Sequence, residues 1–452
     1  MILHCQTALI DGVAVPDVRI HSSADGRIAA IERGTPPREG DARLGLVMPG
    51  AGNAHSHAFH RALRGRTHDK GGDFWRWRDS MYAAAARLDP ETYHELALGV
   101  FGEMLTSGWT AVGEFHYVHH RPDGSGWPRP HAMELALAEA ASRVGIRLTL
   151  LDTCYLAGGI GQPLAPAQFA FTDGSADAWL ARWWRLRDAL PDGVVLGAAI
   201  HSVRGVPRDA IAEIVRSVPA DVPLHIHLSE QPQENADCLR EHGVTPTGLL
   251  AQLDALSPRL SVVHATHLSD NDVRMLGEAG VTVVMCPTTE ADLGDGIGPA
   301  LRLAGAGATI ALGSDQNAVV DPLLEARGLE AGERLASGLR GRFTPAVLLD
   351  ALSVAGYGAL GLQGGLREGA HCDLVELDGN SVRTIGSESA QLALSATASD
   401  VMRVIVGGEI VADRGRLVLS AETSADPVSL LSRGLRRLDE PAAIETPSED
   451  AP

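Results

Sequence analysis

Eight short apolar segments, each long enough for one strand, recur between residues 49 and 315 and are separated by longer stretches. They end near His55, His116, Thr153, His201, His227, His264, Cys286 and Asp315. The stretches between them include 134–144 and 209–218, whose apolar residues recur at helical spacing. Because strands that alternate with helices build parallel sheets, eight such units predict an α/β protein with a (β/α)₈ TIM-like barrel.

The two ends of the chain carry a different pattern of short strand-like runs with turn signals. Residues 8–10 precede Asp11-Gly12, and residues 401–406 run into Gly407-Gly408. These ends predict one small β-sandwich domain built from both termini. The expected units are residues 1–48 (first part of the β-sandwich), 49–364 (the hydrolase barrel), 365–425 (second part of the β-sandwich) and 426–452 (a C-terminal helix and tail).

Composition excludes several classes of function. The net charge of −19 argues against nucleic-acid binding, which requires a basic surface. No apolar run reaches the roughly 18–20 residues that span a bilayer, and the first residues lack the pattern of a signal peptide. Five scattered cysteines form no Cys-x-x-Cys pair and argue against a disulfide framework. We therefore expect a cytoplasmic protein with no nucleic-acid partner and no membrane partner.

Histidines and one aspartate close the predicted barrel strands. His55 and His57 are two positions apart, so on a strand they point to the same face. One His-x-His is weak by itself, since a single strand-end histidine is more often a structural residue. However, His227 and His264 close the fifth and sixth predicted strands, and Asp315 follows the eighth. Because the carboxyl ends of barrel strands meet at one face, this combination predicts a site for a divalent metal ion.

Seven segments of the chain resemble the amidohydrolase superfamily and, within it, the formimidoylglutamate deiminases of histidine degradation. They are residues 55–59 with 61–62, 74–78 with 81–82, 114–120, 201–204, 225–231, 264–267 and 313–315. Segments 74–78 and 114–120 are more specific than any single superfamily motif. The resemblance covers residues 1 to about 435 and implies a metal-dependent hydrolase on a barrel, flanked by a β-sandwich made from both termini.

The resemblance also implies roles for individual residues. The metal ligands would be His55, His57, His227 and Asp315, with one zinc ion per chain. The catalytic residues would be Glu230, His264 and Asp315. The residues that bind the substrate would be His60, Arg78, Tyr117, His201 and Arg204. The family often has glutamine at the position of His60, which leaves the contact made there open.

The single lysine limits the number of metal ions. Two-metal members of the superfamily commonly bridge their ions with a carbamylated lysine on the fourth strand. Lys70 follows the first predicted strand, whereas the fourth ends at His201. We therefore expect a single-metal site, in which Asp315 is the best placed carboxylate to accept a proton from the water that the metal activates.

The activity that the resemblance implies is hydrolytic deimination. A hydroxide activated by one metal ion would convert N-formimidoyl-L-glutamate, a small anionic amidine, to N-formyl-L-glutamate and ammonia. Two arginines suit its two carboxylates, although Arg78 alone would also fit the polar face of an amphipathic helix. Two alternatives stay open: a single-zinc deaminase of a purine, pyrimidine or triazine, and a non-catalytic scaffold. The resemblance also suggests a homodimer.

Overall fold

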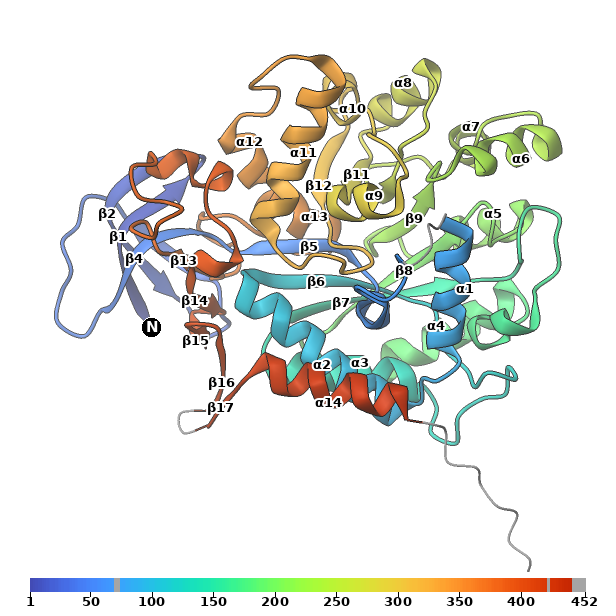
Figure 1. The fold of residues 1–452 in the computed structure, drawn as a ribbon, viewed down its shortest axis with the longest axis horizontal. Coiled ribbons are helices and arrows are strands. Elements are labelled where there is room, and N and C mark those ends of the chain that lie inside the picture. The colour runs from blue at the N-terminus through green and yellow to red at the C-terminus, as the bar shows by residue number, and fades with distance from the viewer. Residues whose placement is uncertain (69–73, 421–422, 441–452) are drawn as a thin grey trace, which may run out of the picture.

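Parallel strands form the centre of the molecule (Figure 1). The structure is a computed structural model and describes residues 1–68, 74–420 and 423–440. The barrel strands are β5 (Ala51–Ser56), β6 (Trp109–His116), β7 (Arg147–Cys154), β8 (Val195–Ser202), β9 (Leu224–Leu228), β10 (Leu260–His264), β11 (Thr282–Met285) and β12 (Thr309–Leu312). They pair in chain order within one eight-stranded sheet.

The first and last strands of this sheet meet and nearly close the ring. Ser56 and Asp315 form a parallel bridge, and the carbonyl of His55 accepts the N–H groups of Ser314 and Asp315 at 3.1 and 3.0 Å. The predicted (β/α)₈ barrel is therefore confirmed. The closing contacts bring the predicted metal ligands of the first and eighth strands to one edge of the ring.

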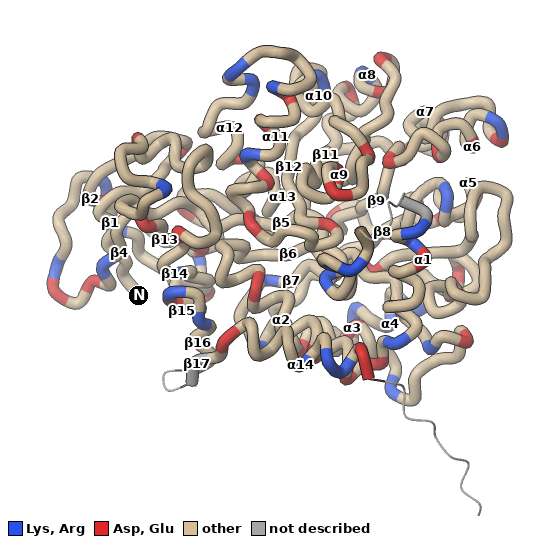
Figure 2. Tube along the Cα trace, viewed as in Figure 1, with Lys and Arg blue, Asp and Glu red and all other residues tan. Residues whose placement is uncertain are grey.

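Helices surround the barrel and connect successive strands (Figure 1). They are α1 (Phe74–Ala85), α2 (Pro90–Ser107), α3 (Ala132–Val144), α4 (Ala176–Ala189), α5 (Arg208–Ser217), α6 (Pro232–His242), α7 (Pro246–Gln252), α8 (Asp270–Glu278), α9 (Pro287–Leu293), α10 (Ala300–Ala306), α11 (Pro322–Ser337), α12 (Pro345–Asp350) and α13 (Gly356–Ala359). The helical periodicity at 134–144 and 209–218 corresponds to α3 and α5. Charged residues of both signs are scattered over the outer helices and loops (Figure 2).

A nine-stranded mixed sheet stands beside the barrel and combines both ends of the chain. Its strands are β1 (Ile2–Ile10), β2 (Val13–Ser22), β3 (Ile28–Glu32), β4 (Ala42–Pro49), β13 (Leu374–Leu377), β14 (Val401–Val406), β15 (Glu409–Asp413), β16 (Arg416–Ser420) and β17 (Thr423–Ala425). β4 pairs with β13 in antiparallel fashion and so joins the two ends. This sheet confirms that one small β domain is built from both termini.

The last described helix, α14 (Pro427–Asp439), packs against α2. The two backbones approach closely because glycines lie at the crossing: a Cβ on Gly434 would lie 2.6 Å from the Cα of Leu96. The predicted tail from residue 441 onward lies outside the described residues. Among the helices that the structure describes, none is long and apolar enough to cross a membrane.

Candidate active site

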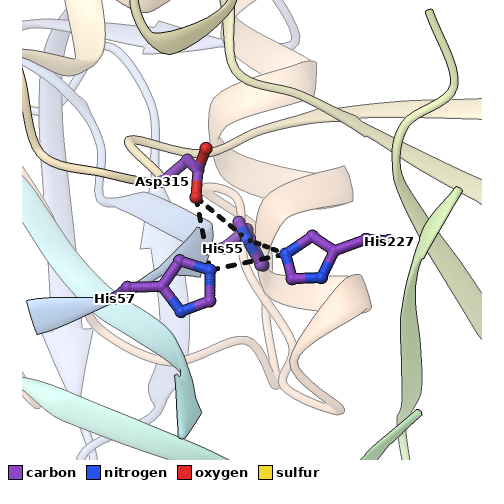
Figure 3. A group of neighbouring side chains, drawn as sticks. All are labelled: His55, His57, His227 and Asp315. Atoms are coloured by element: carbon purple, nitrogen blue, oxygen red, sulfur yellow. Dashed lines mark hydrogen bonds and ion pairs between the residues drawn. The ribbon is translucent and has the colours of Figure 1, made fainter. Parts of the chain in front are cut away.

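Three imidazoles and one carboxylate converge at the carboxyl end of the barrel (Figure 3). His55 lies in β5, His57 directly follows it, His227 lies in β9, and Asp315 lies three residues beyond β12. The Nε2 atom of His227 is 3.1 Å from that of His55 and 3.4 Å from that of His57. Asp315 Oδ1 lies 3.2 and 3.3 Å from the Nε2 atoms of His55 and His57. All four residues are buried.

Backbone carbonyls fix the protonation of two of these imidazoles. His57 Nδ1 lies 2.8 Å from the carbonyl oxygen of Phe115, and His227 Nδ1 lies 2.8 Å from that of His201. Because a carbonyl only accepts hydrogen bonds, each Nδ1 carries the proton and each Nε2 keeps its lone pair. Burial and the neighbouring His55 lower the pKa of His57 to about 3, which keeps it neutral, as a metal ligand must be.

The ligand atoms fit one divalent ion. With zinc–nitrogen bonds of about 2.0–2.1 Å, a tetrahedral set places its ligand atoms about 3.3–3.4 Å apart, close to the separations seen here. Lone pairs at this spacing repel one another unless a cation lies between them. The four residues brought together are the four that the resemblance implied, and imidazole nitrogen and carboxylate oxygen are ligands that zinc accepts.

An asparagine that the sequence left without a role holds the two closing strands together. Asn317 Nδ2 donates to the carbonyl of His57 at 3.0 Å, and Ser314 Oγ donates to Asn317 Oδ1 at 2.6 Å. Asn317 and Asp315 have left-handed backbones, with φ of 57° and 41°. Such conformations cost on the order of 1–3 kcal/mol each and persist where the surroundings hold them. Asp315, a predicted metal ligand, and its neighbour Asn317 are thus held in strained conformations by these contacts.

His264 lies beside the metal ligands among three carboxylates. Its Nδ1 is 3.5 Å from Glu290 Oε1, and its Nε2 is 3.8 Å from Glu230 Oε1 and 3.9 Å from Asp315 Oδ2. Burial opposes protonation, but these carboxylates outweigh it and raise the pKa of His264 to about 10. The sequence reasoning missed Glu290. Its signal was its position in the first turn of α9, directly after a barrel strand.

Arg204 connects two glutamates at the start of α6. Its Nη2 donates to Glu230 Oε2 at 2.6 Å, and its Nε lies 3.2 Å from Glu234 Oε2. Glu234 is fully buried and accepts the backbone N–H of Ser229 at 3.0 Å. The sequence reasoning missed Glu234 as well, although its four-residue spacing from Glu230 was visible. A substrate carboxylate on Arg204 would therefore be a third anion around this guanidinium.

A cavity of about 230 Å³ opens above these residues. The predicted site residues that line it are His57, His60, Arg78, Tyr117, His201, Arg204, His227, Glu230, His264 and Asp315. His55 is buried beside His57 and His227 and does not line the cavity. Aromatic side chains complete the wall, namely Trp77 and Tyr82, which belong to the segments that carry the resemblance but were assigned no role, and Tyr155, which the sequence did not single out. Tyr155 lies against His201, with ring centroids 4.3 Å apart.

Two predicted substrate residues contact other side chains of the protein. His60 Nε2 lies 2.8 Å from the hydroxyl of Tyr117, and a contact of His60 with the substrate stays a prediction. Arg78 lies in α1, and its guanidinium carbon is 5.6 Å from the centre of the Tyr82 ring. Since Arg78 also lines the cavity, it does more than occupy the polar face of an amphipathic helix.

Comparison with known proteins agrees with this geometry. Residues 46–411 match the amidohydrolase family. The chain is 38% identical to a formimidoylglutamate deiminase of Pseudomonas aeruginosa, over 92% of this chain and 95% of the relative. It is 30% identical to a 5-methylthioadenosine/S-adenosylhomocysteine deaminase of Natronomonas pharaonis, over 89% of each chain.

Solved structures share the whole fold. An amidohydrolase from Brucella melitensis superposes with a TM-score of 0.89 at 32% identity, covering 97% of this chain and 100% of that one. An adenosine deaminase from Xanthomonas campestris with bound zinc gives 0.80 at 24% identity over 97% of each chain, a likeness of fold alone. The family match over most of the chain, together with the identity to its relatives, shows that the chain belongs to the amidohydrolase family.

Proposed function

We propose that this amidohydrolase converts N-formimidoyl-L-glutamate and water to N-formyl-L-glutamate and ammonia, with one zinc ion per chain. The observation that carries the proposal is the content of one small cavity. It is lined by three of the four metal-ligand residues, His57, His227 and Asp315, together with the guanidinium groups of Arg78 and Arg204. The 38% identity to a formimidoylglutamate deiminase supports the same substrate.

The substrate's charges match those of the cavity. Its two carboxylates call for planar guanidinium donors, and such charge-assisted bonds contribute about 1.5–3 kcal/mol each. Arg78 and Arg204 supply them, and the hydroxyl of Tyr117 and the ring of His201 line the same space. The amidine is cationic, so it suits the carboxylates of Glu230 and Asp315.

The chain's own residues would handle the protons. A bound divalent ion supplies Lewis-acid activation of a water molecule at neutral pH. Asp315 Oδ2 accepts a proton from the attacking water, since Oδ1 faces His55 and His57. As the carbon–nitrogen bond breaks, Glu230 takes the remaining proton of the added hydroxyl group and passes it to the departing nitrogen, which leaves as ammonia, and the proton held by Asp315 returns to solvent. His264 donates a hydrogen bond to the oxygen that gains negative charge.

Product analysis tests this reaction. Hydrolysis at the terminal nitrogen yields N-formyl-L-glutamate and ammonia in equal amounts, which proton NMR and an ammonia assay measure together. Hydrolysis at the other carbon–nitrogen bond yields glutamate and formamide instead. Formation of glutamate and formamide would contradict the proposed reaction, and absence of turnover by zinc-loaded protein would contradict the proposed substrate.

A second candidate function follows from the aromatic wall. Trp77, Tyr82, Tyr117 and Tyr155 line the cavity and could stack on a heterocycle. The 30% identity to a 5-methylthioadenosine/S-adenosylhomocysteine deaminase supports this alternative. A neutral ring would leave Arg78 and Arg204 without a carboxylate partner from the substrate, which is why the anionic amidine is our first proposal.

A further inference from the structure

A group of ion-paired side chains, most of them buried, lies behind the loop that connects β6 to α3. Its members are His119, His120, Glu134, Asp152, Asp173 and Arg182. Two of them belong to segment 114–120, one of the most specific segments of the sequence. Of that segment, only Tyr117 has a role in the proposed reaction. The other residues of the segment, His119 among them, take no direct part in that reaction.

His119 is held as an imidazolium. Its Nδ1 lies 2.8 Å from Glu134 Oε1, and its Nε2 lies 2.9 Å from the carbonyl oxygen of Thr153. Burial and Arg182 both oppose protonation, but the carboxylates of Asp152 and Glu134 outweigh them and raise the pKa of His119. Since both ring nitrogens face acceptors, both carry protons, and the ring connects α3 to the end of β7.

This group is an ion-pair network and not a second metal site. His116, His119 and Glu134 lie close enough to hold an ion. However, Arg182 Nη1 is 3.1 Å from Glu134 Oε1 and 3.0 Å from Asp152 Oδ1, so a guanidinium already supplies the cation. A doubly protonated His119 also has no lone pair to offer. Arg182 and His119 together compensate the buried carboxylates.

The network anchors a segment that faces the metal ligands. Within four residues of His119, the carbonyl of Phe115 orients His57 through a 2.8 Å hydrogen bond, and Tyr117 lines the cavity. The backbone N–H of His119 also donates to the carbonyl of Ala170 at 3.0 Å. The position of the segment after β6 therefore depends on the buried contacts of His119.

We propose that His119 is a positioning residue: its ion pair with Glu134 holds the loop after β6 so that Phe115 orients His57 and Tyr117 faces the cavity. His119 acts through these residues, and the structure gives it no contact with a metal ligand among the described residues. The predicted effect of His119 on metal retention rests on the geometry of the metal ligands alone. Its predicted effect on substrate binding rests on the proposed function.

The test is the substitution His119→Gln, which keeps one donor but removes the charge and the second hydrogen bond. A chelator should remove zinc about tenfold faster, the lower end of what substitutions around metal ligands produce. KM for N-formimidoyl-L-glutamate should rise about tenfold through misplacement of Tyr117. The value of kcat with saturating zinc and substrate should change less, by about twofold.

Two further variants separate positioning from general stability. Glu134→Gln removes the partner charge and should reproduce both effects, even if His119→Gln does not fold. Arg147→Gln breaks the 2.6 Å ion pair with Asp373 at the opposite end of β7. This control should lower the melting temperature while keeping wild-type zinc retention and KM.

Wild-type zinc retention and KM in folded His119→Gln or Glu134→Gln protein would overturn the proposal. A second zinc ion in the wild type that is lost in His119→Gln would also overturn it, because His119 would then be a ligand. If the wild type does not turn over the formimidoyl compound, the proposed function fails. The rate of zinc release still decides the role of His119.

Discussion

At the scale of single residues, neighbouring groups decide whether each titratable atom of the site carries a proton. Sequence spacing predicted that His55 and His57 share a face, because the strand period is two. It could not predict that the carbonyls of Phe115 and His201 fix the imidazoles, or that Glu234 and Glu290 support Arg204 and His264. Those contacts depend on how loops from different strands fold over one another, which no local pattern encodes.

The buried partner of Arg204 offers a test at this scale. Glu234→Gln keeps an acceptor for the N–H of Ser229 but removes the charge that holds the guanidinium. We expect kcat/KM for N-formimidoyl-L-glutamate to fall roughly thirtyfold, about 2 kcal/mol, because Arg204 loses part of its orientation. Steady-state kinetics measure this, with the exposed Glu241→Gln on the same helix as control. Equal kinetics in the two variants would remove Glu234 from the site.

Glu114 gives a prediction about pH. It is fully buried, and burial raises its pKa to about 8, although Ala58 donates its N–H to Oε1 at 2.6 Å. Because the folded state binds this proton more tightly than the unfolded state, the stabilising contribution is complete at low pH and is lost as pH rises through the folded pKa. Between pH 5 and 8 the free energy of unfolding should fall by on the order of 3 kcal/mol from this group.

Urea unfolding at several pH values checks this contribution. Glu114→Gln should flatten the fall in stability between pH 5 and 8, because the neutral amide keeps an acceptor and has no proton to lose. The exposed Glu139→Gln should keep the wild-type slope. An unchanged slope in Glu114→Gln would show that this carboxylate is ionised in the fold.

At the scale of elements, the sequence was most informative where periodicity is strong. The eight predicted strand ends lie at or within three residues of the ends of β5 to β12. Asp315 lies beyond its strand because the chain bends there to pair with Ser56, a long-range contact that strand period does not predict. The close crossing of α2 and α14 could likewise not be predicted from the sequence, because it joins segments more than 300 residues apart.

The close packing of α2 against α14 can be tested by adding one methyl group at Gly434. A Cβ at Gly434 would lie 2.6 Å from the Cα of Leu96, so Gly434→Ala must push α14 away from α2. We expect a loss of about 1–3 kcal/mol of stability, as for other overpacked contacts. Calorimetry measures it, with the exposed neighbour Arg433→Ala as control. A variant as stable as the wild type would mean that the two helices have room to separate without cost.

At the scale of the whole molecule, the predicted metal ligands come from the first, fifth and eighth strands of the barrel, so a bound cation would connect these strands. Zinc that binds only the folded protein should stabilise it by about 4 kcal/mol at a free concentration a thousand times its dissociation constant. Removing zinc with a chelator should therefore lower the melting temperature, and one equivalent per chain should restore it. Recovery that requires two equivalents would contradict the single-metal site.

We propose that the metal site acts on an anionic amidine. The most direct measurement compares ammonia release by zinc-loaded protein from N-formimidoyl-L-glutamate, N-formimidoyl-L-aspartate, guanine and cytosine at equal concentrations. The roles proposed for Arg78 and Arg204 predict that kcat/KM is greatest for the glutamate compound and that the two heterocycles are not deaminated. Turnover of a heterocycle alone would keep the metal chemistry and contradict the assignment of these arginines to substrate carboxylates.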